Sequence, residues 1–189
     1  MGLELITAPA TEPVTLAEAK AHLRVDAADE DALITRLIAA AREQAERLTG
    51  RAFIAQSWIL RRDSWPENPA RALEIPKPPL IEIASVSVYD RSGAQIILSN
   101  DLYIVDDASA PGRVVLKRTC VLPADPREAD AVAIAFDAGY GEDASDVPAA
   151  IRTAVLHLTA HLYESRGDKN AVPPAQALAL LAPFRVMGL

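Results

Sequence analysis

The sequence predicts an α+β protein, mainly a helical bundle with a small antiparallel β-sheet inserted between its helices. Apolar residues recur at helical spacing near the N-terminus and again after residue 146, whereas the middle of the chain alternates between apolar and polar positions. Prolines and glycines separate these patterns. We therefore expect helices over residues 15–24, 30–49 and 147–165, and a β insertion over residues 53–138.

A short capped helix is expected to precede a long amphipathic one. Thr15 is followed three residues later by Glu18, so each side chain can accept a backbone N–H that the first helical turn leaves free. Gly50 is suited to end the second helix, which has an apolar stripe with charged flanks. The stripe comprises Leu33, Leu37, Ala41, Ala45 and Leu48, widened by Ile34 and Ile38. A helix this apolar on one side needs a partner surface.

Residues 53–138 have the features of short antiparallel strands. Residues 56–62 are rich in strand formers, and residues 83–98 predict a hairpin with its turn at Ser92 and Gly93. Residues 1–13 are apolar and then contain prolines, so we expect an extended arm there rather than a helix.

The C-terminal part predicts one long helix and one short one. Asp146 can cap the helix over residues 147–165. We assign residues 1–172 to a single domain and residues 173–189 to a C-terminal docking segment. This apolar segment could enter a groove of a partner or pack on its own domain, and the sequence leaves both possibilities open.

Composition excludes several functional classes. The 189 residues have a net charge of −7, which argues against a protein that coats DNA or RNA because phosphate binding depends on clustered Lys and Arg. The lone Cys120 cannot form an internal disulfide and fits a reducing compartment. The N-terminus lacks a signal-peptide pattern, and no apolar run is long enough to span a membrane. We expect a soluble, cytoplasmic protein that does not bind membranes.

Two histidines four residues apart are the best candidates for metal chemistry. His157 and His161, with Glu164 nearby, could approach one metal ion. However, Leu158 takes the place of the general base in the His-Glu-x-x-His motif, and no third ligand accompanies the pair. We therefore expect no metal site, no cofactor and no catalytic residue.

Taken in order, several segments resemble the head–tail connector (adaptor) proteins of long-tailed phages and gene transfer agents. They are TLAEAKAHLRVD, DALITRLIAAAREQAERLTGRAF, QSWILRRDSWP, IPKPPLIEIASVSVYD, the AGYG turn and VPAAIRTAVLHLTAHLYESRG. The resemblance covers nearly the whole chain.

The resemblance implies a non-enzymatic structural protein of a virion or phage-like particle. Such proteins assemble as rings, commonly of twelve subunits, beneath the portal protein and receive a tail-proximal stopper protein. DNA passes through the channel without sequence-specific binding. The resemblance also implies that the C-terminal segment docks on the portal, and we assign this role to Leu181, Phe184 and Arg185. The alternatives are a tail-side stopper or completion protein, and a small metal-dependent hydrolase that uses the two histidines.

Overall fold

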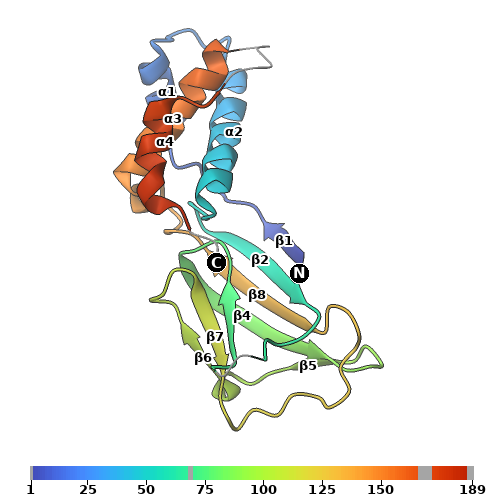
Figure 1. Ribbon diagram of the computed structural model, residues 1–189. Helices are drawn as coiled ribbons and strands as arrows, with labels where there is room; N and C mark the ends of the chain where they lie inside the picture. Colours follow the sequence, from blue (N-terminus) through green and yellow to red (C-terminus); the bar gives the residue numbers. More distant parts are fainter. Residues whose placement is uncertain (1, 68–69, 166–171, 187–189) are drawn as a thin grey trace. The chain divides into compact units, whose positions relative to one another are not determined.

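The computed structural model describes residues 2–67, 70–165 and 172–186, and the chain divides into two compact units (Figure 1). The first, here called the β unit, comprises Met1–Ala8 and Ala55–Gly139. The second, the helical unit, comprises Pro9–Ile54 and Tyr140–Leu189. Each unit therefore combines stretches that are far apart in the sequence.

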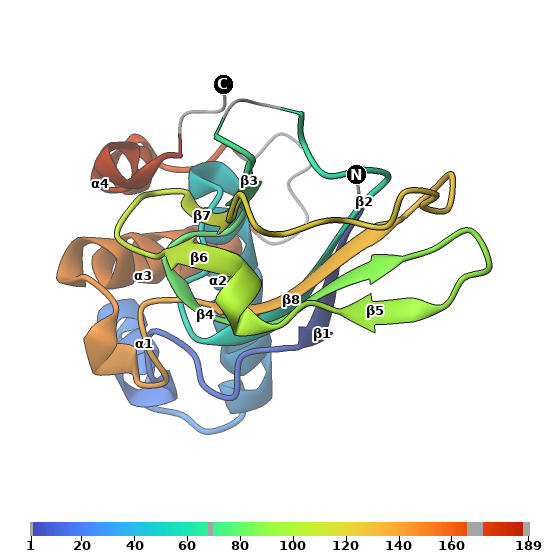
Figure 2. The same ribbon diagram turned by 90° about the horizontal axis from the view of Figure 1, so that it is seen from below.

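The β unit contains two antiparallel sheets (Figures 1 and 2). The larger has the strand order β1-β2-β8-β4-β5, and the smaller has the order β3-β7-β6. The strands are β1 (Gly2–Thr7), β2 (Gln56–Arg62), β3 (Ala72–Ile75), β4 (Leu80–Tyr89), β5 (Gln95–Ile97), β6 (Tyr103–Asp106), β7 (Gly112–Leu116) and β8 (Val132–Ala138). The predicted hairpin is confirmed as β4 and β5, with Gly93 in the turn at a φ of 85°.

Aligned apolar residues on three neighbouring strands form the centre of the larger sheet's buried face. Leu60 of β2 lies opposite Ile134 of β8, which in turn lies opposite Val86 of β4. Directly paired residues in a sheet point to the same face, so these three side chains lie together. All three are buried. The smaller sheet approaches closely, since a Cβ atom at Gly112 of β7 would lie 2.8 Å from the Leu80 side chain of β4.

The helical unit is built from α1 (Leu16–Leu23), α2 (Asp31–Thr49), α3 (Ala149–Glu164) and α4 (Ala175–Leu181). Helix α3 packs against the other three helices. Their buried aliphatic side chains include Ile34, Ile38, Ile151, Val155, Leu158 and Leu181, which belong to a single core cluster. None of the described helices is long and apolar enough to cross a membrane.

The capping box predicted for α1 is confirmed. The Glu18 carboxylate accepts the Thr15 N–H at 2.7 Å, and the Thr15 hydroxyl oxygen accepts the Glu18 N–H at 3.2 Å. Arg152 of α3 donates to Glu18 at 2.5 Å and to the Pro13 carbonyl at 3.0 Å. A local sequence motif is thereby tied to a distant helix.

The fold class is α+β as predicted, but the description as mainly a helical bundle is not confirmed. Eight strands in two sheets accompany the four α-helices among the described residues. The N-terminal arm is a strand, since β1 pairs with β2. Each strand of the smaller sheet has at most five residues, too few to predict a separate sheet from alternation alone.

Two finer predictions about the helices are wrong. Asp146 does not cap α3; its carboxylate accepts the Asp143 N–H in the preceding 3₁₀ turn, and Pro148 occupies the N-cap position of α3. The buried stripe of α2 is also rotated from the predicted one, although Ile34, Ile38, Ala41 and Ala45 are buried as predicted. Leu33, Leu37 and Leu48 are only partly buried, whereas Arg42 and Glu46 are buried. Their burial is possible because the two charges pair with each other.

Candidate interaction surfaces

The histidines considered for metal binding do not form a common site. His157 packs edge-to-face against His22 of α1, with 5.3 Å between ring centroids. The carbonyl of His161 accepts hydrogen bonds from Ser165 at the end of α3. Across residues 2–67, 70–165 and 172–186, no three His, Cys, Asp or Glu side chains are grouped so that they could hold a metal ion.

The C-terminal segment packs on the helical unit itself. Arg51 donates to the Phe184 carbonyl at 2.6 Å, and the Val186 N–H donates to the Thr49 carbonyl at 2.8 Å. Of the three residues assigned to docking, Leu181 is 1% exposed in the helical core, Phe184 is partly buried against that core, and Arg185 is exposed.

The outward side of this segment is almost uncharged. Its exposed positions before Arg185 are Ala175, Gln176, Ala179, Ala182 and Pro183. Small side chains let another backbone approach closely, and Arg185 adds one positive charge at the end of the surface. Residues 173–186 therefore pack on their own unit and present a compact, almost uncharged surface.

A buried charge cluster lies between α2 and the chain segment that precedes α1. Arg42 donates to Glu12 at 2.8 Å and to Glu46 at 2.9 Å, and Glu46 also accepts the Phe53 N–H at 2.9 Å. Burial raises the pKa of Glu12 above the ordinary value of 4.5, because the loss of hydration outweighs the attraction of Arg42. The cluster fixes the course of the chain on both sides of α2.

A pocket of about 360 Å³ lies beside this cluster. Val14, Leu16 and Ile38 give it an apolar lining, and Thr11 and Thr35 add hydroxyl groups. The residues around it hold the start of α1 against α2. The carboxylates of Glu12 and Asp143 also line it, but Glu12 is paired with Arg42 and Asp143 is exposed, so the pocket suits an apolar group rather than a reaction.

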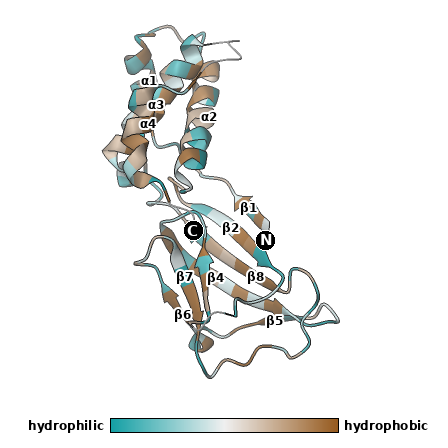
Figure 3. Ribbon diagram, in the orientation of Figure 1, coloured by the Kyte–Doolittle hydropathy of each residue, from teal (hydrophilic) through white to brown (hydrophobic). Residues whose placement is uncertain are grey.

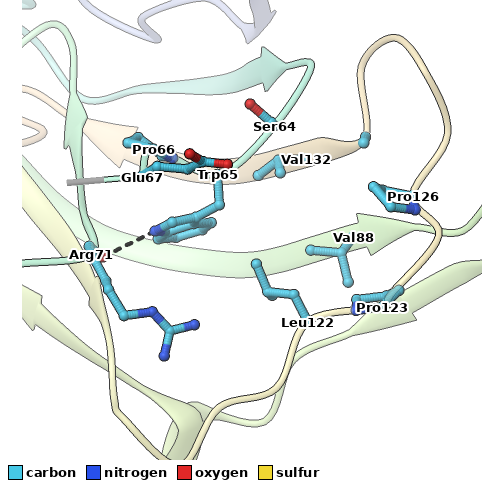
Figure 4. A pocket seen from close by; sticks show the side chains of 11 residues that line it. Ser64, Trp65, Pro66, Glu67, Arg71, Val88, Leu122, Pro123, Pro126 and Val132 are labelled. Atoms are coloured by element: carbon cyan, nitrogen blue, oxygen red, sulfur yellow. Dashed lines mark hydrogen bonds between the residues drawn. The ribbon is translucent and has the colours of Figure 1, made fainter. Parts of the chain in front are cut away.

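A second pocket, of about 350 Å³, lies in the β unit (Figure 4). Trp65 and Leu122 line it together with Val88 of β4 and Val132 of β8. The Trp65 indole N–H donates to the Arg71 carbonyl at 2.9 Å, so the polar end of the ring is already satisfied. Ser64, Glu67 and Arg71 add polar groups to the lining, but these are not arranged as a nucleophile and its base.

Six exposed aliphatic side chains of the β unit lie on strands at the edges of its sheets. They are Leu5 and Ile6 on β1, Ile96 and Ile97 on β5, and Ile104 and Val105 on β6, with 38–66% of each side chain exposed. Figure 3 shows the hydrophobic colouring on these outer strands. Edge strands of monomeric proteins are commonly protected by charges or prolines, and these three contain no Lys or Pro.

The sequence did not point to the β5 and β6 edges as candidate surfaces, whereas an extended arm such as residues 1–13 often packs on a neighbour. The apolar residues were visible in the N-terminal arm and in the hairpin, but only the strand order shows that β1, β5 and β6 lie at edges. The absence of Lys and Pro was the one signal that could have drawn attention to them.

The chain was also compared with known proteins. Residues 13–99 match the family model described as phage gp6-like head-tail connector protein. No curated protein matches the chain.

Solved structures match over the full length. A chain from the neck of an empty GTA (gene transfer agent) particle, solved with C6 symmetry, has a TM-score of 0.83 and 26% identity. A chain from the neck of the native particle, solved with C12 symmetry, has a TM-score of 0.82 and 25% identity. A chain from the virion of the native particle gives the same two values. Each match covers 100% of this chain and 97% of the other.

The resemblance predicted from the sequence is thereby confirmed, together with a structural connector role in a virion or phage-like particle. The family and the structural neighbours are components of particles. They carry no statement about enzymatic activity.

Proposed function

We propose that this chain, a head–tail connector protein, assembles as a ring of twelve subunits beneath a portal protein and joins the head of a phage-like particle to its tail. A tail-proximal stopper protein binds the other side of the ring, and DNA passes through the central channel. The observation that carries the proposal is the full-length similarity to chains from particle necks with C6 and C12 symmetry. Rings repeat one contact many times, so individually weak contacts add up to a stable joint.

The charge of the chain suits a channel through which DNA moves. A net charge of −7 repels the phosphate backbone on average, so the wall of such a ring would not hold DNA by non-specific attraction. The ring carries out no chemical step.

The C-terminal segment provides the portal contact in this proposal. Leu181 and Phe184 do not contact the portal directly. Their apolar side chains pack on the helical core and so hold the segment in position. Arg185 acts from the surface, where its exposed guanidinium can pair with a carboxylate of the portal. Since the segment is already ordered, less conformational entropy is lost when it binds.

A charge reversal at Arg185 tests this contact. Truncation after Pro174 would also remove Leu181 from the core, so a surface substitution separates docking from folding more cleanly. We expect Arg185→Glu to weaken binding to the portal protein of the same gene cluster by about tenfold or more, because like charges across an interface repel. Arg47→Glu on the exposed side of α2 is the matched control and should bind like the unchanged protein.

A pull-down of the unchanged protein with the portal protein, followed by mass photometry of the complex, distinguishes the connector from the tail-side alternative. A complex with the mass of a portal plus a full ring supports the connector. If the unchanged protein binds a purified tail tube but not the portal, the chain is a stopper or completion protein instead.

The absence of enzymatic activity has its own test. We expect the purified protein to contain far less than one zinc ion per chain, because His157 faces His22 and the ligand set is incomplete. Stoichiometric zinc that is lost in His161→Ala would instead support the hydrolase alternative.

A further inference from the structure

The two edges of the larger sheet in the β unit are different from each other and are both aliphatic. Strand β1 forms one edge and exposes Leu5 and Ile6; strand β5 forms the other and exposes Ile96 and Ile97. Each edge thus carries two consecutive large aliphatic side chains that are more than a third exposed. The β4–β5 hairpin that carries the second edge is visible along its length in Figure 2.

Such edges favour the addition of a further strand. A sheet edge leaves backbone N–H and C=O groups without strand partners, and pairing with another strand satisfies them while the exposed side chains are buried. Two unlike surfaces at opposite edges of one sheet produce a head-to-tail contact, which can close into a ring. Contact between two identical edges would give a twofold dimer instead.

We propose that the β1 edge of one copy pairs with the β5 edge of the next copy, so that the larger sheet continues across the subunit boundary. This inference rests on the proposed ring and specifies which surfaces close it. A second copy is the occupant because each chain supplies both edges and because the similar chains of known structure belong to necks with cyclic symmetry.

The charges of the two edges allow this pairing. Strand β5 has no charged residue, and the only charged residue of β1 is Glu4, which lies 3.9 Å from Arg61 on the adjacent strand. No like charges therefore oppose each other across the contact. The pairing would bury Ile97, the most exposed of the edge-strand aliphatics.

Cross-linking with cysteines tests the contact directly. The protein carrying both Ile6→Cys and Ile97→Cys is assembled on the portal protein and treated with a short bismaleimide. Paired strands lie about 4.8 Å apart, so thiols on adjoining edges would be within reach. The natural Cys120 is buried and is not expected to react. We expect a ladder of cross-linked species up to the mass of a full ring in the double variant, and no ladder in either single variant.

The matched control combines Ile6→Cys with Ile104→Cys, which places the second thiol on the edge strand of the smaller sheet. A ladder in this control but not in the first pair would overturn the β1–β5 contact in favour of β6. A cross-linked dimer of Ile6→Cys alone would indicate a twofold contact and would also overturn it. A ring by mass photometry without any ladder refutes the contact but keeps the proposed function, whereas no ring at all refutes both.

Discussion

The helical unit and the β unit both have an apolar core, but they differ in where their charged side chains and their exposed aliphatic side chains lie. The helical unit buries charge, since Arg42 and Glu46 lie inside it and Arg152 ties the start of α1 to α3. The β unit instead has an apolar centre around Ile134 and leaves aliphatic side chains on its edge strands. The charged groups inside the helical unit are paired within that unit. The exposed edge strands of the β unit, by contrast, would be covered only in an assembly. Four predictions test this contrast, from the largest expected effect to the smallest.

Leu158→Ala should destabilise the helical unit most. Leu158 is fully buried on α3, and loss of a large aliphatic side chain from a packed core costs about 2–5 kcal/mol of unfolding free energy. Hydrogen exchange should show loss of protection in α2, α3 and α4. Leu156→Ala, at a partly buried position of the same helix, serves as the control and should cost less. An equal loss of protection in both units would show that they unfold together and would weaken the contrast.

Arg42→Met should cost a similar amount, because it leaves the buried Glu46 and the partly buried Glu12 without their cation. The Arg42 and Glu46 side chains are 8% and 9% exposed, and breaking such a buried pair typically costs about 3–5 kcal/mol. Denaturant titration measures the loss. Glu43→Gln removes an exposed neighbouring charge and should change stability by about 0.5 kcal/mol or less. A loss below about 1 kcal/mol in Arg42→Met would mean that water replaces the pair.

Glu12 and Glu18 should give pH effects of opposite sign. The N–H of Thr15, and then its hydroxyl and Arg152, lower the pKa of Glu18 below 4.5, so its contribution is present above that pH and is lost on acidification. Burial raises the pKa of Glu12, so its protonated form stabilises the fold and this contribution is lost as the pH rises through the raised pKa.

We therefore expect Glu18→Gln to lower stability by about 0.5–1 kcal/mol near neutral pH, with the deficit fading in acid, since Glu18 is partly exposed. Glu12→Gln should gain stability relative to the unchanged protein as the pH rises from about 4.5. Thermal unfolding across this pH range measures both. Parallel pH profiles for the two variants would contradict the assignment.

Ile97→Ala should have the smallest effect on folding. Its side chain is 66% exposed, so its removal should change the stability of the isolated protein by about 0.5 kcal/mol or less. Ile134→Ala removes the same side chain from the buried centre of the sheet and should cost about 2–5 kcal/mol. If Ile97→Ala were as destabilising as Ile134→Ala, the β5 edge would be part of the core and not a contact surface.

Local chemistry explains which parts of the fold could be predicted. The capping box at Thr15, the end of α2 at Gly50 and the turn at Gly93 depend on residues within a few positions of one another, and all three are confirmed. The rotation of the α2 stripe could not be predicted from the spacing of Leu33 and Leu37. It depends on the burial of Arg42, whose partner Glu12 is thirty residues away in the sequence.

The sequence by itself determined the order of the helices, the antiparallel character of the middle of the chain and the resemblance to head–tail connectors, because short-range periodicity and motif order carry this information. Only the tertiary structure decided that residues 2–7 join the larger sheet, that Leu181 lies in the helical core, and that β1 and β5 form opposite edges. These features depend on hydrogen bonds and burial between distant segments. No local pattern specifies which strand will be left without a neighbour.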